Sequence, residues 1–156
     1  MPASFDLQAY VPYLLNRAAI RIADAFEEEL KRRDLTVSTW RLLAALWHDG
    51  PSRLSDLAEG AAVDVSTLSR MVTAAQKKGF VSRVRSETDA RAVRLDLTAE
   101  GRVITATIIP LALECERRVL NDFSEDEMAF LRRLLQRVYK NAAELDFRTD
   151  PLRRAV

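Results

Sequence analysis

The sequence predicts a mainly α-helical protein that carries a single two-stranded β-hairpin. Apolar residues recur at steps of three and four along most of the 156 residues, which is the period of a helix with one buried face. Between residues 80 and 97 the period changes to alternation, which is typical of β-strands. Only four glycines and five prolines are present, so long irregular loops are not expected. Together these observations indicate six helices and one hairpin joined by short connections.

A long amphipathic helix is expected at the start of the chain, from about Leu7 to Arg33. Its apolar stripe consists of Val11, Leu14, Leu15, Ala18, Ile22, Phe26 and Leu30. Later helices are marked by Ser, Thr or Asp, whose side-chain oxygen accepts a hydrogen bond from the first turn. These helices are expected to begin at Thr36 or Ser38, Ser52, Asp64 or Ser66, Thr98 and Ser124. Gly50 and Gly79 end the second and fourth helices, and Pro110 should bend the fifth.

The hairpin is expected to join two β-prone stretches, residues 80–84 and 92–97, through the polar tip at 85–91. Charge is concentrated in the same part of the chain. Residues 64–94 carry a net charge of +4, whereas the whole chain carries +1. A locally basic segment in a nearly neutral protein resembles a nucleic-acid-binding surface. Chance clustering of cations on a solvated face is the alternative.

Several classes of function are not expected. The single cysteine, Cys115, excludes an intramolecular disulfide and a cysteine-based zinc site, and the single histidine, His48, excludes a histidine-rich metal site. No glycine-rich phosphate loop or catalytic triad is present, so the sequence predicts no enzyme, no catalytic residue, no metal and no cofactor. No apolar run approaches the roughly 20 residues that span a bilayer. The start of the chain does not resemble a signal peptide, and we expect a cytoplasmic protein without a membrane partner.

Three short helices followed by a hairpin make up the plan of a winged helix-turn-helix. The second helix of a helix-turn-helix enters the major groove of DNA with small polar or basic side chains near its start. The fourth helix of this chain offers Ser66, Thr67, Ser69, Arg70 and Thr73 for this purpose. Further cations that we expect to contact DNA are Lys77, Arg83, Arg85 and Arg94. The fourth helix alone also fits an ordinary amphipathic surface helix, and the basic hairpin favours DNA.

Specific stretches of the sequence resemble the MarR family of winged helix-turn-helix transcriptional regulators. They are Asp56–Ala58, Val65–Val72, Lys77–Val81, Arg83, Asp89–Leu95 and Leu97–Gly101. The resemblance implies a homodimer that binds duplex DNA at a pseudo-palindromic operator. The expected role is that of a repressor, and a transcriptional activator is the alternative. It assigns residues 1–35 and 98–148 to dimerisation and residues 36–97 to the DNA-binding domain, and we expect residues 149–156 to form a flexible tail. The long, apolar terminal helices agree, because three short helices cannot cover them.

The resemblance also assigns a role to the tip of the hairpin, the wing. The family motif there is Asp, one residue, then Arg, which Asp89 and Arg91 match. The carboxylate can hold the guanidinium extended so that it enters the narrow, negative minor groove. A plain surface ion pair is the alternative. Ala90 occupies a position that is often basic in the family, so one wing cation is missing.

Family members often bind a small aromatic or acyl ligand between the dimer helices and the DNA-binding lobe. In this chain the expected lining residues are Tyr13, Arg17, Arg21 and Trp40, and the expected ligand is an aromatic acid or an acyl-CoA thioester. Alternatively, Trp40 is a core residue and the arginines are solvated or lie at the dimer seam. The alternative function is a winged-helix protein-interaction module without ligand control.

Overall fold

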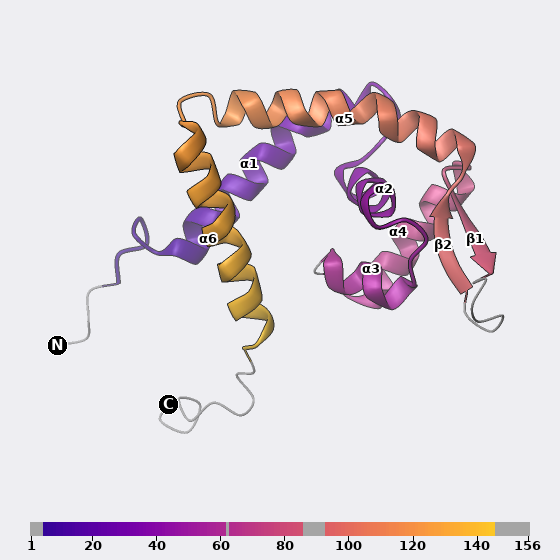
Figure 1. The fold of residues 1–156 in the computed structure, drawn as a ribbon, viewed down its shortest axis with the longest axis horizontal. Helices are drawn as coiled ribbons and strands as arrows, with labels where there is room; N and C mark the ends of the chain where they lie inside the picture. The colour runs from indigo at the N-terminus through magenta and orange to yellow at the C-terminus, as the bar shows by residue number, and fades with distance from the viewer. Residues whose placement is uncertain (1–4, 62, 86–92, 146–156) are drawn as a thin grey trace. The chain divides into compact units, whose positions relative to one another are not determined.

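The fold of the chain was described from a computed structural model, which describes residues 5–61, 63–85 and 93–145. The elements follow the expected order, with six helices and one antiparallel hairpin (Figure 1). They are α1 (Val11–Lys31), α2 (Val37–Asp49), α3 (Leu54–Gly60), α4 (Val65–Lys77), β1 (Val81–Arg85), β2 (Val93–Leu97), α5 (Ala99–Val119) and α6 (Glu125–Ala143). Two compact units are formed, Met1–Glu116 and Arg117–Val156. The predicted fold class is confirmed.

Most helix starts were predicted correctly because the capping side chains make the expected hydrogen bonds. The Thr36 hydroxyl accepts from the Thr39 N–H at 3.1 Å, and Ser124 forms a reciprocal capping box with Glu127. The prediction that Ser52 caps α3 was wrong. Ser52 instead exchanges two backbone hydrogen bonds with Leu95, at 3.0 and 2.8 Å, and so adds a short bridge beside β2.

The winged-helix lobe, which we define as α2, α3, α4, β1 and β2, has its own apolar core. In Figure 1 these elements lie together, with α4 between α3 and the hairpin. The core residues are Leu42, Leu43, Leu46, Leu57, Ala58, Leu68, Val72, Ala75, Val81, Leu95 and Leu97. The hairpin is in register from Val81 opposite Leu97 to Arg85 opposite Val93. This core fixes the positions of α4 and the hairpin, the two elements expected to meet DNA.

A second core joins the end of α1 to α5. Its buried members are Phe26, Leu30, Leu35 and Ile108. Phe80 and Ile104 pack against both cores, so they connect the lobe to α5. At this junction Gly101 lies so close to the Phe80 backbone that a Cβ atom on it would be 2.0 Å from the Phe80 carbonyl oxygen.

Many apolar side chains of α1 and α6 remain exposed to solvent. α6 has no buried residue, and α1 buries only Phe26 and Leu30. Large apolar side chains exposed on these two helices are Val11, Leu14, Ile20, Ile22, Phe130, Leu135, Val138 and Tyr139. In the part of the chain that the structure describes, no helix is long and apolar enough to cross a bilayer. No group of three or more potential metal ligands is found among those residues.

Candidate DNA-binding surface

Helix α4 begins at Asp64, whose carboxylate organises the first turn. The carboxylate accepts the Thr67 N–H at 2.8 Å and the Thr67 hydroxyl at 2.6 Å. It also accepts the hydroxyl of Ser66. These hydrogen bonds, led by those from the Ser66 and Thr67 hydroxyls, hold the pKa of Asp64 well below its usual range. The carboxylate is therefore ionised at neutral pH and is held at the positive end of the helix dipole.

The two sides of α4 differ sharply in burial. Leu68, Val72 and Ala75 are buried in the lobe core. Six residues of α4 are expected to contact DNA. Thr67 is half-buried, and the other five are exposed: Ser66, Ser69, Arg70, Thr73 and Lys77. The structure therefore brings all six of these predicted residues to the solvent-facing side of one helix.

Arg70 has no hydrogen-bond or ion-pair partner among the described residues. The Thr73 hydroxyl, in contrast, donates to the Ser69 carbonyl oxygen at 2.9 Å. An exposed guanidinium without a partner offers several N–H donors in a planar fork, which suits base acceptors and phosphate oxygens.

The wing lies beside this face of α4. An apolar cleft of about 190 Å³ separates the two and is lined by Leu54, Ser69, Val72, Arg83, Val93 and Leu95. Ser69 of the helix and Arg83 of the wing therefore share one groove. Arg85, which the sequence predicted in the tip of the hairpin, is the last residue of β1. Asp89 and Arg91 lie outside the described residues.

Arg94 has a structural contact that its sequence position did not reveal. Its side chain is half-buried, and its guanidinium donates to the Pro51 carbonyl oxygen at 3.2 Å. The Nε atom is buried and has no hydrogen-bond partner among the residues that the structure describes. This arrangement ties β2 to the α2–α3 connection. Arg94, predicted as a wing cation, therefore has a role inside the fold.

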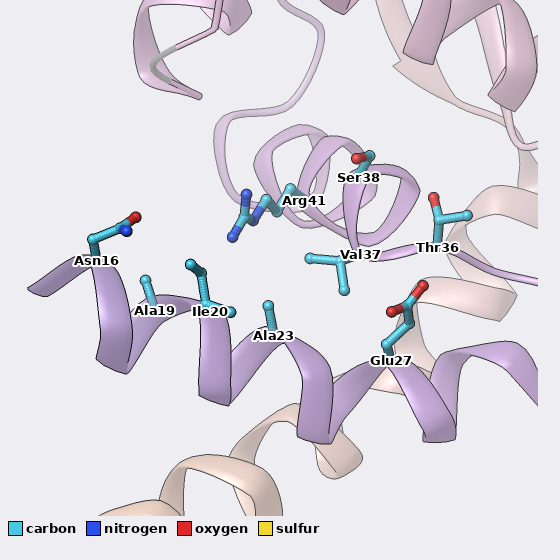
Figure 2. Close-up of a pocket in the computed structure, with 9 residues that line it drawn as sticks. All are labelled: Asn16, Ala19, Ile20, Ala23, Glu27, Thr36, Val37, Ser38 and Arg41. Atoms are coloured by element: carbon cyan, nitrogen blue, oxygen red, sulfur yellow. The ribbon is translucent and has the colours of Figure 1, made fainter.

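A larger cleft of about 500 Å³ lies between α1 and α2. Figure 2 shows Asn16 and Ile20 of α1 facing Arg41 and Val37 of α2 across it. The full lining is Asn16, Ala19, Ile20, Ala23, Glu27, Thr36, Val37, Ser38 and Arg41.

The four residues that the sequence suggested for a ligand do not line this cleft. Trp40 packs edge-to-face on Phe26, with ring centroids 6.0 Å apart, beside the second core. Arg17 lies over the Tyr13 ring at 5.4 Å from its centroid, and Arg21 is exposed. Arg41, the neighbour of Trp40, is the cation that faces the cleft. No local signal in the sequence distinguishes Arg41 from the other polar residues of α2, because its position depends on how α2 packs against α1.

Comparison with known proteins identifies the family. The model of the MarR family matches residues 35–93. The transcriptional regulator PecS of Dickeya dadantii is 30% identical over 130 residues, which are 81% of this chain and 78% of PecS. The chain belongs to the MarR family. As a MarR-family protein it is a DNA-binding transcriptional regulator and not an enzyme, which confirms both predictions.

Two further relatives extend the match beyond the family's central segment. The transcriptional repressor IacR of Pseudomonas putida is 28% identical over 146 residues, covering 92% of this MarR-family chain and 87% of IacR. The crystal structure of a MarR-family regulator from Silicibacter pomeroyi superposes with a TM-score of 0.77 at 27% identity, covering 90% of this chain and 95% of that one. The similarity therefore includes the terminal helices.

Proposed function

We propose that this chain is a dimeric repressor that reads a pseudo-palindromic operator with α4 and the wing, and that a small anionic ligand releases it. The observation that carries the proposal is the exposed face of α4. On this face Arg70 has no partner among the described residues. Ser69 of the same helix lines one groove together with Arg83 of the wing. Two such surfaces related by a two-fold axis require two half-sites about one helical turn, or roughly 10 base pairs, apart.

The repressor assignment is supported by IacR, whose name describes a transcriptional repressor. A repressor needs only to occupy its operator, so the DNA-binding surface and the dimer suffice for it. No separate activating surface is required.

The dimer is supported by the uncovered apolar side chains of the terminal helices. Phe130, Leu135 and Val138 are each more than 40% exposed on α6. A helix this apolar gains most of its stability from packing its apolar face against another element. We propose that residues 1–35 and 98–148 of two copies cover one another, with residues 36–97 left to bind DNA.

The ligand proposal rests on the chemistry of the α1–α2 cleft. Ile20 and Val37 give it an apolar wall, while Arg41 and Asn16 supply donors at one end. Glu27 makes the other end unfavourable for an anion. This arrangement suits an aromatic acid, or the acyl part of a CoA thioester, with its negative group at Arg41.

A physical link connects the cleft to α4. Thr36 and Val37 line the cleft, and two residues earlier Asp34 forms the turn with a positive φ of 55°. The Lys78 ammonium at the end of α4 donates to the Asp34 carboxylate at 2.6 Å and also to its carbonyl oxygen. A ligand that shifts the α1–α2 turn would therefore shift the end of α4, and this gives the two sites a shared element.

The DNA-binding proposal is tested by footprinting the chain on promoter DNA and measuring the affinity of variants. We expect Arg70→Ala to weaken binding by about 1–3 kcal/mol per subunit. Arg32→Ala is the matched control, since it removes the same charge at the end of α1. Equal affinities for the two variants, or an asymmetric footprint without a repeat, would contradict the proposal.

The ligand proposal is tested by titrating aromatic acids and acyl-CoA thioesters while following tryptophan fluorescence and release of DNA. We expect Arg41→Ala to weaken ligand binding at least about tenfold, which is the loss of one charged contact. Arg17→Ala should have little effect. The reverse order of effects would place the ligand at Tyr13, Arg17, Arg21 and Trp40 instead. Lys78→Met should keep ligand binding but reduce the release of DNA.

A further inference from the structure

The exposed face of α4 carries a regular stripe of polar side chains. Ser66, Arg70, Thr73 and Lys77 follow one another at steps of four, three and four residues, which puts them on one face of a helix. The buried residues of α4 lie on the opposite side. The stripe is therefore the part of α4 that meets the major groove first if this helix reads DNA, as proposed above.

Both hydroxyl groups of the stripe already use their proton inside the protein. Ser66 donates to the Asp64 carboxylate, and Thr73 donates to the Ser69 carbonyl oxygen at 2.9 Å. Carboxylate and carbonyl oxygens carry no proton, so the direction of each bond is fixed by chemistry. Because a hydroxyl has a single proton, only its acceptor lone pairs remain for a partner outside.

We infer that α4 reads its half-site with a fixed hydrogen-bond polarity. Ser66 and Thr73 act as acceptors and select bases with an exocyclic amino group, cytosine or adenine. Arg70 acts as the donor and selects a base with acceptors in the major groove, foremost guanine. Asp64, which the sequence did not assign to DNA recognition, determines specificity indirectly because it retains the proton of Ser66. This inference rests on the proposed role of α4 as the recognition helix.

The Asp64 carboxylate is firmly held in the position that this role requires. It also accepts the N–H and the hydroxyl of Thr67, at 2.8 and 2.6 Å. Turning the Ser66 proton towards a base would leave the ionised Asp64 carboxylate with one donor fewer. Keeping that donor in place is the lower-energy arrangement, so the polarity should persist in the complex.

The first experiment identifies the bases that the two hydroxyls contact. The full-length chain selects its preferred duplex from a library of random DNA. Single bases are then replaced by analogues that lack the amino group, purine for adenine or pyrimidin-2-one for cytosine. Where a hydroxyl accepts from that amino group, we expect the parent to lose about two- to tenfold in affinity, the value of one hydrogen bond. Ser66→Ala or Thr73→Val should show no further loss at the same base.

The opposite pattern would overturn the inference. If the loss that depends on Ser66 or Thr73 appears when a base acceptor is removed, as with 7-deazaguanine, the hydroxyls donate. If no base substitution depends on either residue, the hydroxyls do not read bases. Failure of the parent to select any sequence would overturn both this inference and the proposed function. If the parent selects a sequence but Ser66 and Thr73 donate hydrogen bonds to the bases, the inference is overturned and the proposed function stands.

The second experiment tests Asp64 itself. Asp64→Gly is tolerated at an N-cap but has no side-chain oxygen, so the Ser66 hydroxyl loses its acceptor and its proton is released. We expect discrimination for the amino-bearing base at the Ser66 contact to fall at least about threefold, since a free hydroxyl can donate or accept. Asp56→Asn removes the same charge from α3 and should strengthen binding to all sequences equally. An unchanged base preference in a folded Asp64→Gly protein would contradict the role of Asp64.

Discussion

Helices α2 and α6 are both amphipathic, yet they bury their apolar side chains to opposite extents. α2 buries Leu42, Leu43 and Leu46 in the lobe core, whereas α6 has no buried residue. The difference teaches that an apolar stripe predicts that a helix face is covered, but not what covers it. For α2 the cover is the rest of the lobe. For α6 we propose that it is a second copy of the chain.

The largest effects should come from truncating leucines on the two helices. We expect Leu43→Ala to lower the free energy of unfolding by about 2–5 kcal/mol, because it leaves a cavity in a closed core. Leu135→Ala on α6 should mainly weaken the dimer, so its melting temperature should depend more strongly on protein concentration. Urea denaturation and analytical ultracentrifugation measure the two effects. Two results would contradict the proposed difference between α2 and α6. One is a Leu135→Ala protein that is monomeric yet as stable as the parent, and the other is a Leu135→Ala protein that dimerises as tightly as the parent.

The junction between the lobe and α5 provides the next test. A Cβ atom at Gly101 would meet the Phe80 carbonyl oxygen at 2.0 Å, and that oxygen belongs to the backbone. We expect Gly101→Ala to destabilise the protein by about 1–3 kcal/mol or more, since α5 must move away from the lobe. Ala106→Ser, an exposed position on the same helix, is the control. Thermal unfolding that is unchanged by Gly101→Ala would refute this close packing.

A third prediction separates the lobe from α6 by function. Arg91→Ala in the wing should weaken binding to many DNA sequences by about 1–3 kcal/mol per subunit, because the wing is expected in the minor groove. The fold should stay intact. Lys140→Ala removes a charge from α6 and should leave DNA affinity nearly unchanged. Fluorescence anisotropy at fixed salt measures both, and equal losses would show that general charge, and not the wing, is responsible.

The smallest effect concerns the carboxylates at the starts of α4 and α6. The Ser66 and Thr67 hydroxyls lower the pKa of Asp64, and the Ser124 N–H lowers that of Glu127. A carboxylate with a lowered pKa in the folded state stabilises the fold above its ordinary pKa, near 4, and loses this effect as the pH falls. Melting temperatures between about pH 6 and pH 3 should therefore fall less for Asp64→Asn than for the parent.

Glu127→Gln is the matched change on α6. If α6 is stabilised by the dimer, its acid sensitivity should depend on protein concentration, while that of Asp64 should not. A parallel acid response at all concentrations would remove this distinction between the two helices.

Much of the fold was predictable because it depends on local chemistry. The spacing of apolar residues and the capping side chains define where the helices begin. Two glycines with positive φ, Gly50 and Gly79, mark where α2 and α4 end. Ser52 was wrongly predicted to cap α3 because its backbone pairs with Leu95. Leu95 is 43 residues away, and a local sequence pattern cannot predict such a pairing.

The candidate site shows the same division. The exposed side of α4 follows from its helical period, so the sequence predicted which of its residues face solvent. The cleft between α1 and α2 was expected between these helices, but Arg41 was missed because the rotation of α2 is set by Trp40 packing on Phe26. Arg94 was read as a wing cation, and its bond to Pro51 arises only in the folded chain.

Phe80 and Ile104, which belong to both cores, limit where the chain can be cut. A fragment that ends at Leu97 would keep the helix-turn-helix and the hairpin but would lose Ile104 and the Gly101 contact with Phe80. The smallest piece with a closed interior therefore extends into α5, beyond the sequence motif of the winged helix. In this chain the segment that carries the DNA-binding motif is therefore shorter than the segment that can fold on its own.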